Sequence, residues 1–359
     1  MFRFRTYSHA KTLSSALFGV ALLSAVNSFA AVSQSPLSLT VGVPPNMLLT
    51  LDDSGSMRWA FAPDSMGATH TTRRAKSSDY NPIYYNPNVI YKAPIVFTTA
   101  GVEQQLSTSF TAAWHNGFNT TVGSVDLSKA NYRVSWDVPI TAAPSSYSYT
   151  NTTKYSGTGT VYRLAQNPSA DFSASATISS KNPKSTVTTA NGKISFVITR
   201  NSSDACTATA TLAGVTITAT CSGSSGNFTA TLTELSVPPY YYIYDATIAS
   251  NCTTANDSCY RLNFVETAER QNFANWYSFY RNRALSTVSA AALAFYDLSS
   301  SVRLSWQSLG NCTTFSSTSE SSQCKNNAFK EYSPTHKGQL YAWLQSIVFD
   351  QSTPLPAAL

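Results

Sequence analysis

The chain has 359 residues, of which only 12% are charged, and a formal net charge of +6. Three of the 24 Lys and Arg residues, and none of the acidic ones, lie in residues 1–30, so the remainder carries a formal charge of only +3. No stripe of Lys or Arg follows, which excludes an extended nucleic-acid-binding surface. Even without that first segment, the chain is longer than one hydrophobic core usually organises, which favours two or more domains.

Residues 1–30 have the pattern of a secretory signal peptide. Arg3, Arg5 and Lys11 precede an apolar stretch, Leu13 to Val26, that serines interrupt. We predict cleavage after Ala30. An uncleaved anchor is the alternative, but this stretch is short for a membrane span, and no later stretch has the length of a transmembrane helix.

The strand predicted for Asn46–Leu51 leads into the sequence Asp-Asp-Ser-Gly-Ser. Asp52, Ser54 and Ser56 form a D-x-S-x-S pattern at the carboxyl end of this strand, the edge where open α/β sheets bind ligands. A turn there can aim one carboxylate and two hydroxyl oxygens at one point, and Mg²⁺ and Ca²⁺ prefer oxygen ligands. We therefore predict a divalent-cation site whose uncancelled charge attracts a carboxylate from a partner. Asp53, at the variable position, is predicted to be a loop residue, and a solvated Asp/Ser turn is the alternative to a metal site.

Two stretches rich in tyrosine and proline, Tyr80–Pro94 and Pro238–Tyr244, flank a long region rich in Ser and Thr. Frequent proline forbids helix, so we predict extended segments whose rings pack under a loop-rich domain rather than form a ligand surface. Between them, residues 122–235 contain short β-branched alternations and an Asn191-Gly192 turn. This pattern predicts an all-β region.

The segment from Cys206 to Cys221 predicts a hairpin with its turn at Ala213-Gly214. This register pairs Leu212 with Val215 and, at the open end, Cys206 with Cys221. Those two cysteines then form a hydrogen-bonded pair with a Cα separation of about 5.5 Å, within the reach of a disulfide. Alternate small apolar residues share one face of this hairpin, and the threonines share the other.

All six cysteines follow residue 30, and none are spaced as C-x-x-C. In an exported chain such cysteines indicate disulfides, for which the sequence leaves 15 connectivities. Besides Cys206 with Cys221, we expect Cys252 to pair with Cys259 and Cys312 with Cys324, on the sole ground that these pairs are close in sequence.

The character of the sequence changes after Glu266. Apolar residues recur at three- and four-residue steps across residues 269–298, which predicts one long amphipathic helix. Ser301–Leu309 is a predicted strand and Lys337–Asp350 a second helix. Alternating strands and helices indicate an α/β sheet with helical cover, to which the strand Asn46–Leu51 also belongs.

The D-x-S-x-S pattern resembles the first loop of the metal-ion-dependent adhesion site in von Willebrand factor A-type domains. In that family a second loop supplies a threonine and a third an aspartate. The sequence STPLPAAL is similar to the second loop, which implies Thr353 as a further ligand, and the third loop would lie beyond Leu359. The resemblance implies an α/β fold with a doubly wound open sheet, incomplete at its C-terminus, and a large inserted β-rich domain. The implied segments are a signal peptide (1–30), the first strand and metal loop (31–58), the insertion (59–266) and the continuation of the A-type domain (267–359).

Three blocks, PPNMLLTLDDSGSM, YNPIYYNP and RQNFANWYSFYRNR, resemble in the same order the N-terminal region of the PilY/PilC family of type IV pilus tip-associated adhesins and assembly factors. The resemblance implies adhesion and pilus assembly through the metal site. The implied partners are pilus subunits or minor pilins and a host or surface protein, and the implied location is the periplasm, outer membrane or cell surface at the pilus tip. Proteins of this family are longer and end in a β-propeller, so we expect the chain to be truncated.

Other classes of function fit the sequence less well. Ser54 and Ser56 lie in no serine-hydrolase motif, and the histidines that remain after export, His70, His115 and His336, stand in no recognisable catalytic frame. No H-E-x-x-H sequence supports zinc catalysis. We therefore predict that the chain is not an enzyme. An exported β-rich scaffold without a metal site is the competing hypothesis.

Overall fold

The computed structural model describes residues 44–130, 132–148, 152–155, 161–163, 169–212, 214–232, 237–315, 324 and 326–353. The predicted signal peptide, residues 1–30, lies outside them. Within these ranges, no helix is both long and apolar enough to cross a bilayer.

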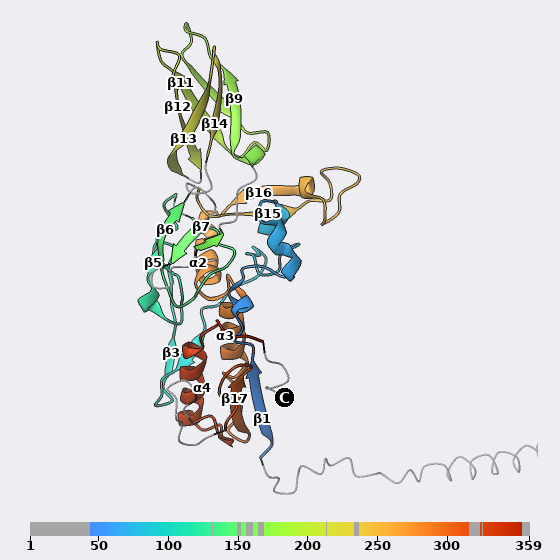
Figure 1. Ribbon diagram of the computed structural model, residues 1–359, viewed down its shortest axis with the longest axis vertical. Helices are drawn as coiled ribbons and strands as arrows, with labels where there is room; N and C mark the ends of the chain where they lie inside the picture. Colours follow the sequence, from blue (N-terminus) through green and yellow to red (C-terminus); the bar gives the residue numbers. More distant parts are fainter. Residues whose placement is uncertain are drawn as a thin grey trace, which may run out of the picture. The chain divides into compact units, whose positions relative to one another are not determined.

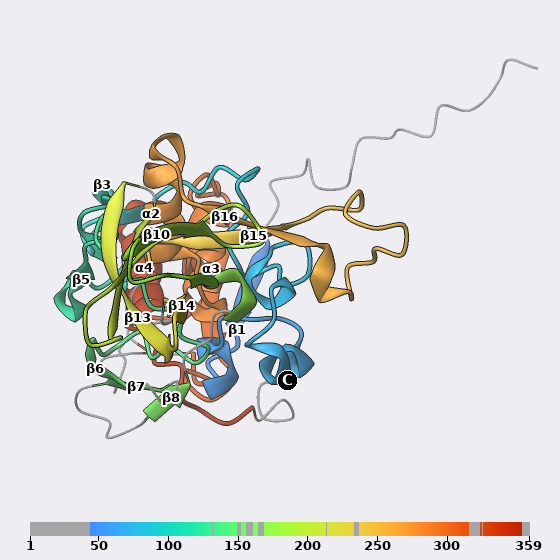
Figure 2. The ribbon, with the colours of Figure 1, turned by 90° about the horizontal axis from the view of Figure 1, so that it is seen from above.

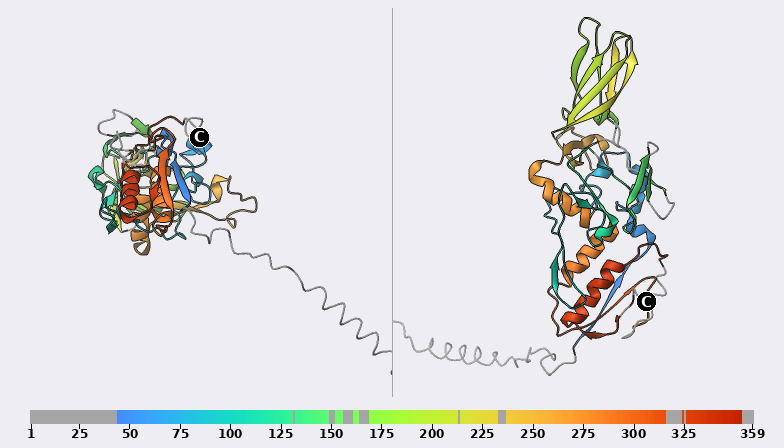
Figure 3. Two further views of the ribbon diagram at one scale, coloured as in Figure 1. Left: turned by 90° about the horizontal axis from the view of Figure 1, so that it is seen from below. Right: turned by 90° about the vertical axis from the view of Figure 1, so that its left-hand side faces the viewer.

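The predicted metal loop follows the first strand of a three-stranded mixed sheet. Strand β1 (Asn46–Leu51) pairs in parallel with β17 (Arg303–Ser308), and β18 (Lys330–Glu331) pairs antiparallel with β17. The blue strand β1 and the orange strand β17 lie side by side in Figure 1 and in the left view of Figure 3. Two strands that are far apart in sequence are therefore neighbours, as the predicted α/β sheet requires.

Helices α3 (Arg283–Ala294) and α4 (Pro334–Ser346) share one hydrophobic core with this sheet. Leu51, Leu304 and Trp306 contribute from the strands, and the core also contains Leu285 and Leu340 from the two helices. The red helix α4 lies beside β17 in Figure 1 and in the left view of Figure 3, and His336 of α4 contacts the Leu304 carbonyl of β17. The sheet edge that carries the metal loop is thus supported by helices, which keeps the backbone of the loop on a rigid base.

The sequence prediction of one long helix over residues 269–298 is wrong. The structure has two helices there, α2 (Arg270–Phe279) and α3, separated by Tyr280, Arg281 and Asn282. Asn282 has extended backbone angles, and its side-chain oxygen accepts a hydrogen bond from the Leu285 N–H at 2.8 Å. An asparagine that caps a new helix in this way competes with continuation of the preceding helix. The spacing of the apolar residues does not change at the break, so the sequence pattern did not reveal it.

Helix α4 begins three residues before its predicted start and ends four residues before its predicted end. Ser333 caps it by accepting a hydrogen bond from the His336 N–H at 3.3 Å, and Pro334 occupies its first position. Proline lacks an N–H and is tolerated at that position, so the Ser-Pro pair defines the start.

The Ser- and Thr-rich region forms a six-stranded antiparallel sheet, labelled at the top of Figure 1. Its strands, in the order in which they pair, are β10 (Lys184–Thr188), β11 (Ser195–Arg200), β12 (Cys206–Leu212), β13 (Val215–Ser224), β14 (Asn227–Thr231) and β9 (Ser173–Thr177). The predicted hairpin register is confirmed, because Leu212 pairs with Val215 and Ala208 with Ala219. Alternate apolar residues of β12 are buried and its threonines are exposed, as predicted.

All three predicted disulfides are present. Cys206 and Cys221 have a Cα separation of 5.8 Å, close to the predicted distance. Cys252–Cys259 closes the segment between β15 (Tyr240–Tyr244) and β16 (Tyr260–Phe264), which projects from its neighbours in Figures 1 and 2. Cys312–Cys324 follows β17.

Short elements make up the remainder of the described chain. They are β2 (Ile95–Phe97), β3 (Glu103–Gln105), β4 (Ala113–Trp114), β5 (Ser124–Val125), β6 (Pro144–Ser148), β7 (Thr152–Tyr155), β8 (Val161–Arg163) and several 3₁₀ turns. The tyrosines of the two Tyr/Pro-rich stretches pack as predicted, since Tyr85 lies 4.9 Å from Phe273 of α2, ring centroid to ring centroid, and Tyr240 is fully buried.

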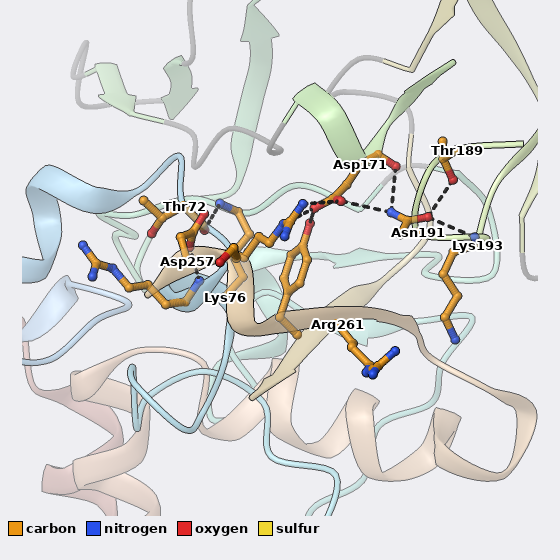
Figure 4. A network of polar contacts seen from close by, with 12 residues as sticks. Thr72, Lys76, Asp171, Thr189, Asn191, Lys193, Asp257 and Arg261 are labelled. Carbon is orange, nitrogen blue, oxygen red and sulfur yellow. Dashed lines mark hydrogen bonds and ion pairs between the residues drawn. The ribbon is translucent and has the colours of Figure 1, made fainter. Parts of the chain in front are cut away.

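A polar network joins the turns that flank β9 and β10 of the six-stranded sheet to the segment before the first Tyr/Pro-rich stretch (Figure 4). Asp171, only 3% exposed, accepts two hydrogen bonds from Arg73, at 2.7 and 2.9 Å. It also accepts hydrogen bonds from the Tyr242 hydroxyl and the Asn191 amide. A buried carboxylate with this many charge-assisted and neutral donors is well compensated for its loss of hydration.

Candidate metal centre

Two of the predicted ligands lie in direct contact. The hydroxyl oxygens of Ser54 and Ser56 are 3.0 Å apart, and Asp52 lies at the same turn, where its Oδ1 accepts the Ser54 N–H at 2.8 Å. Ser54 has extended backbone angles, and a short 3₁₀ helix, Gly55–Arg58, begins directly after it. The structure therefore brings together the three side chains of the D-x-S-x-S pattern.

The spacing of the two hydroxyls fits a shared cation. Two neighbouring oxygens of an octahedral Mg²⁺ shell, each about 2.0–2.1 Å from the metal, are about 2.8–3.0 Å apart. The observed 3.0 Å equals the upper value, although a hydrogen bond between the hydroxyls accounts for the same distance. Asp52 and Ser56 are half-buried, so this donor set is open to solvent on one side.

Asp53 has a different role from its neighbour. It is only 1% exposed, and its carboxylate accepts hydrogen bonds from the Ser308 hydroxyl at 2.6 Å, the Gly310 N–H at 3.0 Å and the Asn311 amide at 3.0 Å. These donors lie at the end of β17 and just after it. Asp53 therefore ties the metal loop to the neighbouring strand, and its carboxylate is already committed to these three donors.

The segment after α4 reaches the metal loop. The Gln351 N–H donates to the Asp53 carbonyl at 3.1 Å, and the Gln351 carbonyl accepts the Gly55 N–H at 3.0 Å. Thr353 follows two residues later, within about 7 Å of Gln351 along the chain. It is exposed, and within the described part of the chain its hydroxyl makes no hydrogen bond. The structure thus brings the segment that carries Thr353 to the loop without joining its side chain to Asp52, Ser54 or Ser56.

Backbone pairing also holds the far side of the loop. The Ala60 N–H donates to the Trp136 carbonyl at 2.9 Å, and the Val138 N–H donates to the Arg58 carbonyl at 3.1 Å. Between these bonds Arg58 and Asp137 form an ion pair with a distance of 3.3 Å. Burial raises the pKa of Asp137 to about 6, and the Arg58 charge opposes this rise.

Sequence reasoning did not identify the contributions of Asp53 and Gln351. The side-chain alternation of β1 could have revealed the first: Leu51 is buried, and Asp53, two residues later, continues on the same inward side. Gln351 carried no comparable signal, because it interacts through its backbone.

Among the described residues, no three His, Cys, Asp or Glu side chains converge as a metal-binding group. His115 contacts the Tyr277 hydroxyl and His336 the Leu304 carbonyl, so both have partners remote in sequence from the two serines of the loop.

A comparison of the sequence with known proteins shows to which family the chain belongs. The chain is 34% identical over 357 residues to the type IV pilus biogenesis factor PilY1 of Pseudomonas aeruginosa strain PAO1, an alignment that covers 97% of the chain. The chain belongs to the PilY1/PilC-like family. The PilY1 proteins of strains PAK and UCBPP-PA14 are each 33% identical to it, again over 97% of the chain. The chain spans 23% of the length of these relatives. No family model and no solved structure matches this PilY1/PilC-like chain.

Proposed function

We propose that this PilY1/PilC-like chain is exported and acts in type IV pilus biogenesis and adhesion, through a divalent cation held by Asp52, Ser54, Ser56 and Thr353. The pilus role is supported by the name of the P. aeruginosa relatives, of which the chain spans less than a quarter. Three disulfides support export, because such bonds persist in oxidising compartments. The partners we propose are pilus subunits or minor pilins and a surface protein.

The domain that we propose for this site is a von Willebrand A-type domain, formed by residues 31–58 and 267–359 and interrupted by residues 59–266. The supporting observations are the parallel pairing of β1 with β17, the helices α3 and α4 in the same core, and the loop at the carboxyl end of β1. Ligand sites of open α/β sheets lie at that edge.

The observation that best supports the proposed metal site is the 3.0 Å contact between the Ser54 and Ser56 hydroxyls beside Asp52. When bound, Mg²⁺ or Ca²⁺ supplies a positive centre that a partner's carboxylate can complete. The chain's own residues orient the donors: Asp53 holds the loop to β17, and Gln351 holds it to the segment after α4. Three neutral hydroxyls and one carboxylate leave a divalent charge only partly cancelled, which favours an acidic ligand.

The test is the effect of Mg²⁺ and Ca²⁺ on thermal unfolding of the chain and of its Asp52→Ala variant. A ligand that binds only the folded state raises the free energy of unfolding by about 1.4 kcal/mol at ten times its Kd. For a chain of this size, we expect a rise in Tm of a few degrees in the wild type. We expect no such rise in Asp52→Ala, because the only carboxylate among the proposed ligands is lost.

The matched control is Asp297→Ala, which removes an exposed aspartate at another position. This variant should keep the full cation response. An equal response in the wild type and Asp52→Ala would refute the metal site and leave the scaffold hypothesis. Binding to purified pilus subunits, measured with Mg²⁺ and with EDTA, tests the pilus role separately: binding that survives EDTA supports a pilus partner without the metal.

A further inference from the structure

Two arginines of the block RQNFANWYSFYRNR have contrasting surroundings. Arg283 forms an ion pair with Asp64, Nη2 to Oδ1 at 2.7 Å, and its Nε donates to the Phe61 carbonyl at 2.7 Å. Arg281 is only 8% exposed and forms no ion pair with any residue that the structure describes. A buried charge without a counter-charge is costly, so the surroundings of Arg281 require an explanation.

Part of the cost is offset locally. Arg281 Nη1 donates to the Tyr277 carbonyl at 2.6 Å, and the guanidinium carbon lies 4.4 Å from the centroid of the Tyr277 ring. That carbonyl lies in the last turn of α2, where the helix dipole favours a cation. A guanidinium has five N–H donors, however, and this contact engages one of them.

Arg281 lines a cavity of about 30 Å³. The wall also includes Arg133, whose positive charge adds to that of Arg281, as well as His115 and Ser135. Burial and the charge of Arg281 lower the pKa of His115 to about 4, so this imidazole is neutral at physiological pH and can donate or accept one hydrogen bond. Among the residues that the structure describes, no carboxylate lines the cavity, so the described wall carries two positive charges and no negative one.

The size of the cavity limits what can enter. It exceeds the roughly 10–15 Å³ that one water molecule requires and is far below the several hundred Å³ of a metabolite pocket. Trp136 and Trp276 contribute to the wall, which makes the surroundings of the polar groups apolar. A small anion matches both the volume and the charge, because its attraction to a buried guanidinium in apolar surroundings is stronger than in bulk water.

We propose that this cavity binds one small monovalent anion, of the size of chloride or of a single carboxylate group, with Arg281 as its principal ligand. The proposal does not rest on the metal site or on the proposed pilus function, and its cavity shares Trp136 and Val138 with the backbone pairing beside the metal loop. The anion neutralises Arg281 and thereby stabilises the junction between α2 and α3.

The experiment is thermal unfolding of the full chain at constant ionic strength in sodium gluconate, an anion too large for the cavity. Gluconate is replaced stepwise by bromide and, in a separate series, by formate. At tenfold excess over Kd, we expect Tm to rise by a few degrees in the wild type. A response to formate as well as bromide identifies a site that also accepts a carboxylate from a partner, whereas a response to bromide alone restricts it to halides.

Arg281→Gln should lose this rise, and Arg283→Gln, which removes a neighbouring guanidinium already paired with Asp64, should keep it. Equal bromide responses in the wild type and Arg281→Gln would overturn the proposal. Should Arg281→Gln fail to fold, crystals of the wild type grown in bromide decide the matter. An anomalous peak beside Arg281 supports the site, and its absence there refutes it.

Discussion

The Asp53 carboxylate accepts a hydrogen bond from the Ser308 hydroxyl at 2.6 Å. This bond joins the metal loop to the last residue of β17. Asp53→Ala removes the short bond of this buried hydroxyl, which keeps only a longer one to the Asn311 carbonyl at 3.2 Å, and it also removes the acceptor of the Gly310 N–H and of the half-buried Asn311 amide. Unsatisfied buried donors are expensive, so we expect a loss of about 2–4 kcal/mol in the free energy of unfolding. Urea unfolding measures it.

The matched comparison is Asp52→Ala, one residue earlier. Asp52 is half-buried, and its carboxylate accepts the Ser54 N–H at its own turn. In metal-free buffer we expect this variant to lose no more than about 1 kcal/mol. Similar losses at the two positions would contradict the division of roles between a ligand at Asp52 and an anchor at Asp53.

The predictions that succeeded rest on local pairing and periodicity. The register from Cys206 to Cys221 follows from a two-residue turn and from alternation with period two, and both are properties of neighbouring residues. The first strand was predicted with its observed bounds, because its apolar run ends at two aspartates. The D-x-S-x-S side chains meet at one turn because they are adjacent in sequence.

The predictions that failed or were incomplete depend on tertiary contacts. The side chain of Asn282, buried between α3 and the Val138 carbonyl, ends one helix and begins another, whereas the apolar pattern alone cannot distinguish this from one helix. The pairing of Gln351 with the metal loop uses only backbone atoms, which nearly every residue type has, so the sequence does not indicate it. The A-type fold and the cation site stay predictions.

Lys76 gives a pH prediction. Its amine is fully buried, donating to the His70 carbonyl at 2.5 Å, and desolvation lowers its pKa from 10.5 to about 7. Between these two pH values the unfolded chain binds more protons than the folded one. Stability therefore rises with pH in that window, by at most about 1.4 kcal/mol per pH unit.

The measurement is the free energy of unfolding between pH 7.5 and 9.5 for the wild type, Lys76→Met and Lys181→Met. Lys76→Met should lose this rise, while Lys181→Met, which removes an exposed amine, should keep it. An identical pH slope in Lys76→Met and the wild type would show that Lys76 does not control it.

The Cys206–Cys221 disulfide joins β12 to β13 across a sequence separation of 15. In the chain-entropy model, a loop of this length stabilises by about 3 kcal/mol. Replacing both cysteines by serine should lower the stability of the six-stranded sheet by about 2–4 kcal/mol. Limited proteolysis at increasing urea should then cut within residues 173–231 first, and cleavage that begins in α3 or α4 instead would contradict a local effect.

The last prediction concerns the break between α2 and α3. Asn282 is fully buried, and its Oδ1 accepts the Leu285 N–H at 2.8 Å. Asn282→Ala removes this acceptor at the N-terminus of α3, and loss of a cap costs about 1–2 kcal/mol. Asn282→Ser keeps a capping oxygen, so it should retain most of the stability when both are compared by urea unfolding. Equal losses in the serine and alanine variants would mean that the amide's bond to the Val138 carbonyl, rather than the cap, fixes the junction.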